Sequence, residues 1–178
     1  MKHTCIVALI LLFSFHAMAQ GKTPNPVIPA ADGFVIIKGA SMQPDKNRIY
    51  KAIYDATKAG QDPTQFIPAL NMAGSELNAL GVCGIPVKHA KFVVVFHGAA
   101  IDGILNNELY KKKYGVDNPN QGIIRDLEKA GVRLFVCGQN LLSENIDPKT
   151  ILPAVTVASD ALIVLMSFQN DGYALMSF

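Results

Sequence analysis

The chain has 178 residues, of which 50% are hydrophobic and 17% are charged, and its formal net charge is +2. This length suits one domain with a real core and is too short for two. The one basic run, Lys111–Lys113, is short, and three like charges at a helix end usually form a solvated face. We therefore expect no nucleic-acid partner.

The N-terminus has the pattern of a secretory signal peptide. Lys2 precedes an apolar run, Ile6–Phe15, and Ala17 and Ala19 supply the small residues that signal peptidase needs. The run has about 10 residues, whereas a membrane span needs roughly 20. We expect residues 1–19 to be removed, which leaves a periplasmic or secreted protein without a membrane span.

Two segments precede the first predicted strand. Residues 20–33 contain three prolines and no apolar periodicity, which indicates an extended tether. Phe34–Ile37 is a short apolar run between two glycines, and it predicts either an extra edge strand or an arm that packs on a neighbouring subunit. The folded domain is expected over residues 34–178.

Apolar runs alternate with helical stripes along the rest of the chain. The predicted strands are Ile49–Asp55, Phe92–Phe96, Val132–Cys137, Val155–Val157 and Tyr173–Phe178. The main predicted helices run from Asp62-Pro63 to Gly81, from Ile101 to Gly115, from Asn118-Pro119 to Gly131, and over Ala161–Met166 with Ser159 as its cap. Shorter helical pieces are expected at Leu141-Leu142 and after Asp147-Pro148. The alternation predicts a three-layer α/β/α sandwich with a mainly parallel sheet of about five strands.

Three of the predicted strands end at residues that can do chemistry, namely Asp55, His97 and Cys137. In a parallel sheet these ends share one edge, where ligands and reactive groups collect. Cys137 is either a reactive thiol, with its thiolate stabilised by the N–H groups of a following short helix, or a buried core cysteine. His97 either accepts the thiol proton, contacts a ligand anion, or bonds only to backbone. Asp55 is either a ligand contact or a strand-end cap.

The residues around these strand ends complete the candidate site. Gly98, Gly138 and Gln139, together with Asp55, are the predicted substrate-binding residues. Cys83 either pairs with Cys137, forms a loop thiol, or packs against the core, because sequence alone does not place the two Cα atoms.

Cofactor motifs are missing from the sequence. It has no Cys-x-x-Cys or His-x-x-x-His spacing, which argues against a metal site. It also has no Gly-x-Gly-x-x-Gly or Walker loop and no Gly-x-Ser-x-Gly elbow. We expect no metal, no nucleotide cofactor and no serine nucleophile.

Three stretches together resemble the DsrE/DsrF-like family. They read FVVVFHGAA, DLEKAGVRLFVCGQNL and PKTILPAVTVASDALIVLMSFQNDGYALM, and the resemblance extends from Ile49 to the C-terminus. It implies a five-stranded parallel α/β/α sandwich, assembly as a homo-oligomer (trimer or hexamer), and sulfur relay as a persulfide on a cysteine near the end of a central strand. Cys137 is the residue at that position.

The chain departs from the relay members of that family in one respect. Those members are cytoplasmic and act with partner subunits, whereas the N-terminus here predicts export. Two functions therefore stay open: a thiol-dependent sulfur carrier or transferase that handles a small sulfur-containing ligand at Cys137, and a non-catalytic small-molecule-binding or assembly module of the envelope.

Overall fold

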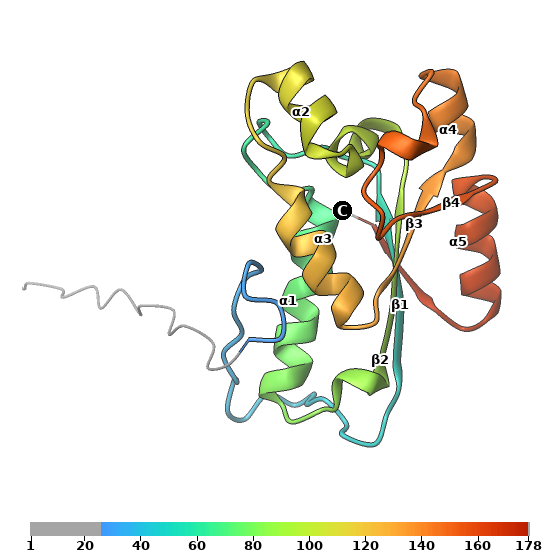
Figure 1. The fold of residues 1–178 in the computed structure, drawn as a ribbon. Coiled ribbons are helices and arrows are strands. Elements are labelled where there is room, and N and C mark those ends of the chain that lie inside the picture. The colour runs from blue at the N-terminus through green and yellow to red at the C-terminus, as the bar shows by residue number, and fades with distance from the viewer. Residues whose placement is uncertain (1–25, 178) are drawn as a thin grey trace, which may run out of the picture.

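Five parallel strands form one sheet in the order β4-β3-β2-β1-β5 in the computed structural model, which describes residues 26–177 (Figure 1). The strands are β1 (Tyr50–Ala56), β2 (Ala90–Phe96), β3 (Arg133–Cys137), β4 (Thr156–Ala158) and β5 (Ala174–Ser177). The predicted parallel sheet is therefore confirmed. Its central strand, β2, is the purely apolar run of the sequence, with Val93–Phe96 fully buried because both faces of the sheet are covered.

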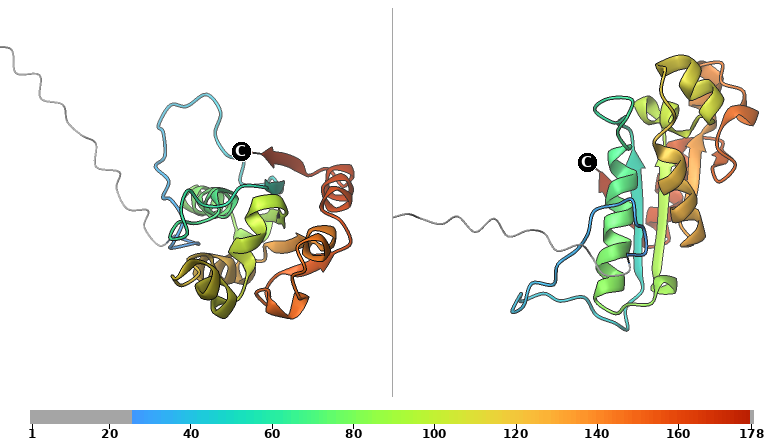
Figure 2. Two further views of the ribbon diagram at one scale, coloured as in Figure 1. Left: turned by 90° about the horizontal axis from the view of Figure 1, so that it is seen from above. Right: turned by 60° about the vertical axis from the view of Figure 1, so that its left-hand side comes forward.

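Helices cover both faces of this sheet. The α-helices are α1 (Pro68–Val82), α2 (Asn107–Tyr114), α3 (Asn120–Lys129), α4 (Gly138–Ser143) and α5 (Ala161–Asn170). Three short 3₁₀ helices join them, η1 (Val87–His89), η2 (Gly98–Ile104) and η3 (Pro148–Thr150). Helices α1 and α3 lie on one face and α5 lies on the other, which gives the three layers seen in Figures 1 and 2.

The strand order explains why α5 stands alone on its face. The chain moves in one direction through β1, β2, β3 and β4, and then returns across the whole sheet to pair β5 with β1. Because crossovers between parallel strands are right-handed, reversing the direction of travel places the connecting helix on the opposite face. The two faces consequently have separate cores, a large one under α1 and α3 and a small one under α5.

The first predicted helix has the expected apolar stripe and different ends. Leu70, Leu77 and Leu80 are buried against the sheet. The helix does not begin at Asp62-Pro63, because the Asp62 carboxylate instead accepts the backbone N–H of Thr64 at 2.7 Å and closes a local turn. Helix α1 begins at Pro68. It also runs past Gly81 to Val82, and Gly84 takes the left-handed conformation (φ +75°).

Two other helix predictions need correction. The stretch from Ile101 to Gly115 is not one helix, because η2 ends at Ile104 and α2 starts only at Asn107, with Asn106 as its cap. The cap of α5 is Asp160 and not Ser159.

The segments before β1 also differ from prediction. Ile28 lies within the predicted tether, yet its side chain is fully buried against α1, so the folded unit starts earlier than residue 34. Phe34–Ile37 forms no strand, and Ile37 is 65% exposed. In Figure 2 this N-terminal part (blue) loops outward beside α1. The predicted signal peptide lies outside the described residues.

No helix within residues 26–177 is both long enough and apolar enough to cross a membrane.

Candidate functional site

The alternation of side chains along each strand brings the predicted site residues to one face. Ile53 and Val95 point into the core under α5, so the residues two positions further along each strand, Asp55 and His97, lie on the same face. Cys137 belongs to that core as well. The last residues paired between β2 and β3 are Phe96 and Val136, so His97 and Cys137 each follow directly after a paired residue.

His97 and Asp55 form a close pair. The Nε2 atom of His97 lies 2.6 Å from Oδ1 of Asp55, and both side chains are about four-fifths buried, with exposures of 22% and 18%. A carboxylate oxygen can only accept, so Nε2 carries the proton in this contact. The pair thereby sets the orientation of the imidazole ring and leaves Nδ1 as its second polar atom.

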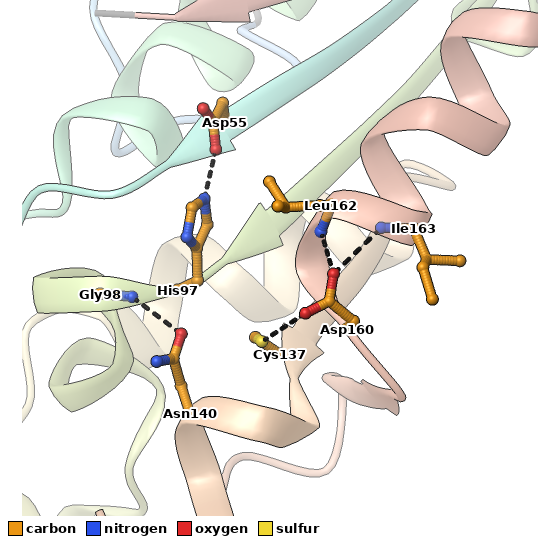
Figure 3. Close-up of polar contacts among 8 residues, drawn as sticks. All are labelled: Asp55, His97, Gly98, Cys137, Asn140, Asp160, Leu162 and Ile163. Carbon is orange, nitrogen blue, oxygen red and sulfur yellow. Dashed lines mark hydrogen bonds and ion pairs between the residues drawn. The ribbon is translucent and has the colours of Figure 1, made fainter. Parts of the chain in front are cut away.

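Cys137 is 4% exposed and contacts a different carboxylate (Figure 3). Its Sγ atom lies 4.0 Å from Oδ2 of Asp160, at the outer limit of a hydrogen bond from sulfur. The other oxygen of Asp160, Oδ1, accepts the backbone N–H groups of Leu162 at 2.7 Å and Ile163 at 3.2 Å, and so caps α5. One side chain therefore joins the thiol to the start of α5.

The site lies where two adjacent strands send the chain to opposite faces. After β3 the chain enters α4, whose Leu141 packs in the core under α1 and α3. After β4 the chain enters α5 on the other face. Open α/β sheets bind their ligands beyond the carboxyl ends of adjacent strands that diverge in this way.

Hydrogen bonds from side chains to the backbone join the segments at this edge of the sheet. The Asn140 side chain in α4 accepts the backbone N–H of Gly98 at 3.3 Å, and the Gln139 amide donates to the carbonyl of Ser159 at 3.3 Å. Gly98 has φ +56°, a conformation that favours glycine. These contacts give Gly98 and Gln139 structural roles at the carboxyl edge of the sheet.

Gly138 is required by close packing. A Cβ atom at this position would lie 2.6 Å from the backbone oxygen of Ala158, so the space beside the glycine is occupied by the end of β4. That space is consequently closed to an incoming sulfur atom.

The sequence predicted that Asp55, His97 and Cys137 share one edge of the sheet, but it did not predict all of their contacts. The structure joins Asp55 to His97, whereas Cys137 has its polar contact with Asp160 and none with His97 in the described part of the chain. Asp160 and Asn140 were missed. The only sequence signal for Asp160 was its place before an apolar helix, where Ser159 was an equally good cap.

Cys83 does not pair with Cys137, and both thiols are free. Cys83 follows the last residue of α1, at the opposite edge of the sheet from Cys137, and packs partly against the large core. Within residues 26–177, no group of three or more His, Cys, Asp or Glu side chains could hold a metal ion.

A separate cavity of about 470 Å³ lies on the other face of the sheet. Its walls come from the segment before β1, from α1, and from β1 and β5, and they include Phe34, Arg48, Leu80 and Met176. Tyr54 also lines it, and burial raises the pKa of this hydroxyl well above its usual range, so Tyr54 is neutral.

Comparison with known proteins identifies the family of this chain. The sequence profile of the DsrE/DsrF-like family matches residues 49–178, and the chain belongs to this family. A search of functionally curated proteins finds no match.

Two solved structures are similar to this chain at low sequence identity. A protein of unknown function from Methanobacterium thermoautotrophicum, MTH1491, is 17% identical with a TM-score of 0.55. The ychN protein from E. coli is 14% identical with a TM-score of 0.49. Each comparison covers 72% of this chain and 99% of the other. MTH1491 supports the fold alone.

Proposed function

We propose that this protein is an exported sulfur carrier that holds sulfane sulfur as a persulfide on Cys137. The supporting observation is the place of this thiol, at the carboxyl end of β3, where the chain diverges into α4 and, after β4, into α5. The side chain of Cys137 makes no cap hydrogen bond with the N–H groups of α4, so the case for its reactivity depends on its place at the strand end.

The transfer needs no net oxidation or reduction. The Cys137 thiol loses its proton, and the thiolate attacks the terminal sulfur of a donor persulfide. The new bond joins the Cys137 sulfur to that terminal sulfur, the sulfur–sulfur bond of the donor breaks, and the donor leaves as a thiolate that takes up a proton. The products are the Cys137 persulfide and the donor thiol.

His97 is the group that we assign to proton handling during transfer. Asp55 occupies its Nε2 atom, and Nδ1 then stays available to a donor molecule that approaches the strand ends. Because Cys137 is only 4% exposed, the rim formed by Gly98, Gln139 and Asn140 has to move before a donor can reach the sulfur.

Intact mass spectrometry tests the proposal on protein purified from the envelope of its native host. The mass of the untreated protein reports where the processed N-terminus lies, which is expected to be Gln20. Treatment with polysulfide should then add the mass of one sulfur atom. Cys137→Ser should abolish this gain, whereas Cys83→Ser, which removes the other free thiol, should retain it. A gain that persists in Cys137→Ser, or no gain in the wild type, contradicts the sulfur-carrier function.

The cavity under α1 favours a second candidate function, the binding of a small apolar molecule. Its volume of about 470 Å³ lies in the usual range for ligand pockets, and its walls are mainly apolar. Ala52 and Ala174 are two of the small residues that keep it open. If Cys137 takes up no sulfur, and an apolar fluorescent probe binds the wild type but not Ala174→Phe, the binding function is preferred.

A further inference from the structure

The carboxylate of Asp160 is held in place by a helix. Its Oδ1 atom accepts two backbone N–H groups at the start of α5, from Leu162 at 2.7 Å and Ile163 at 3.2 Å. Its Oδ2 atom is thereby directed at the Sγ atom of Cys137, 4.0 Å away. The carboxylate cannot turn from the sulfur without giving up the cap of α5, so this contact is built into the fold.

Asp160 is also the charged group in contact with the sulfur. From β1 and β2 the nearest ionisable groups are Asp55 and His97, and these bind each other at 2.6 Å. From α4 the neighbouring side chains are the neutral amides Gln139 and Asn140. Among residues 26–177, no Lys, Arg or His forms an ion pair with Asp160.

We propose that Asp160 is the positioning residue of Cys137: it accepts the thiol hydrogen bond, orients the sulfur, and opposes negative charge on it. A negative charge this close disfavours a second negative charge on the sulfur. Helix α4 offers no opposing hydrogen bond, because the Cys137 side chain makes no cap contact with its backbone.

Asp160 could instead act as a general base for Cys137, and the two roles predict opposite changes in the reaction rate of the thiol. If Asp160 were a general base for Cys137, removing its charge would slow the reactions of the thiol. If it is a positioning residue that holds the proton on sulfur, removing the charge speeds them. The inference refines the proposed function, because it names what controls the thiol that carries the sulfur, but its test uses no sulfur donor.

The test compares Asp160→Asn and Asp160→Ser with the wild type. Both replacements are neutral and are good N-caps, so α5 keeps its start. The control is Asp147→Asn, at the residue that caps η3 through the N–H of Lys149, away from the thiol. The alkylation rate of Cys137 by iodoacetamide is measured against pH by mass spectrometry. Thiolate absorbance, taken as the difference from Cys137→Ser, is measured over the same pH range.

The expected result is a lower pH midpoint in both Asp160 variants and an unchanged one in the control. Alkylation at neutral pH should be about threefold faster, because the larger thiolate fraction is partly offset by the lower nucleophilicity of the thiolate. Unchanged or slower alkylation with an unmoved absorbance midpoint overturns the inference. Thermal unfolding shows whether each variant is folded. If one Asp160 variant is unfolded, the measurements on the other variant test the inference.

The failure of this inference is distinguishable from the failure of the proposed function. If the midpoint moves but the wild type takes up no sulfur from polysulfide, Asp160 controls a thiol that is not a sulfur carrier. If sulfur is taken up and the midpoint does not move, Cys137 carries sulfur without control by Asp160.

Discussion

Gly138 packs so closely against the end of β4 that a side-chain atom would not fit beside it. The residue lies between the reactive candidate Cys137 and the rim residue Gln139, and its missing side chain admits the backbone oxygen of Ala158. The end of β4, which leads into Asp160, is thereby brought against the start of α4. The glycine is needed for this close approach and not for an unusual φ value, since Gly138 is not among the described residues with positive φ.

Gly138→Ala should destabilise the protein. The added Cβ would lie 2.6 Å from a backbone atom that cannot rotate away, so β4 must shift, at a cost of about 1–3 kcal/mol. Gly122→Ala in α3 is the matched control. Its Cβ meets nothing within 4 Å, and alanine should stabilise the helix by roughly 0.5–1 kcal/mol. Urea unfolding of both variants measures the two changes, and equal effects would contradict this packing argument.

At the scale of the elements, a buried amide ties the segment before β1 to α1. Asn78 is 1% exposed, and its side chain accepts the backbone N–H of Ile28 at 2.8 Å. It also donates to the carbonyls of Ile28 and Asp32, both at 3.0 Å. This segment has no strand or helix of its own. The Asn78 side chain therefore supplies hydrogen-bond partners for the backbone groups of Ile28 and Asp32.

Asn78→Leu should release this segment. The variant leaves the N–H group of Ile28 buried and unpaired and removes one of the two hydrogen bonds to its C=O, which should lower the free energy of unfolding by about 2–4 kcal/mol. Asn71→Leu is the control on the same helix. Asn71 also bonds to Asp32, at 3.1 and 2.8 Å, but in an exposed setting, so its loss should cost less than about 1 kcal/mol. Urea unfolding and limited proteolysis before residue 34 measure the difference between the two variants. Equal losses of stability would contradict the proposed role of Asn78 in holding this segment.

At the scale of the whole molecule, two apolar surfaces lie on different sides of the protein. One is the arm, residues 34–37, with Ile37 65% exposed. The other is the α5 patch, formed by Leu162, Ile163 and Met166, each more than half exposed. Helix α5 contains no charged residue, and a helix that is apolar on all sides is normally covered. Single chains would leave both surfaces in water.

We therefore predict that the protein assembles with copies of itself, as a trimer or hexamer in line with the family resemblance. Light scattering at tens of micromolar should give a mass of several chains. Ile163→Lys should lower this mass if the α5 patch is an interface, and Ile37→Lys should lower it if the arm is one. The exposed Lys112→Ala, in α2, is the control for a surface change that leaves the mass unaltered. A mass of one chain for the wild type would falsify the prediction.

Much of this architecture could be read from the sequence, because the signals that define an element are local. The apolar run Phe92–Phe96 is buried on both faces of the sheet, and the stripe of α1 follows from spacing alone. The shared edge of Asp55, His97 and Cys137 also follows, once the strands are taken as parallel. These properties depend on the period of the backbone, which each segment carries with it.

The tertiary structure decided which side chains meet. Asp55 and His97 pair because β1 and β2 are neighbours, and Cys137 meets Asp160 because β4 lies beside β3. Ile28 became a core residue because α1 presents Asn78 to a segment fifty positions away. Such contacts depend on strand order and on how the chain crosses the sheet. They are set by packing between distant segments, which no local period records.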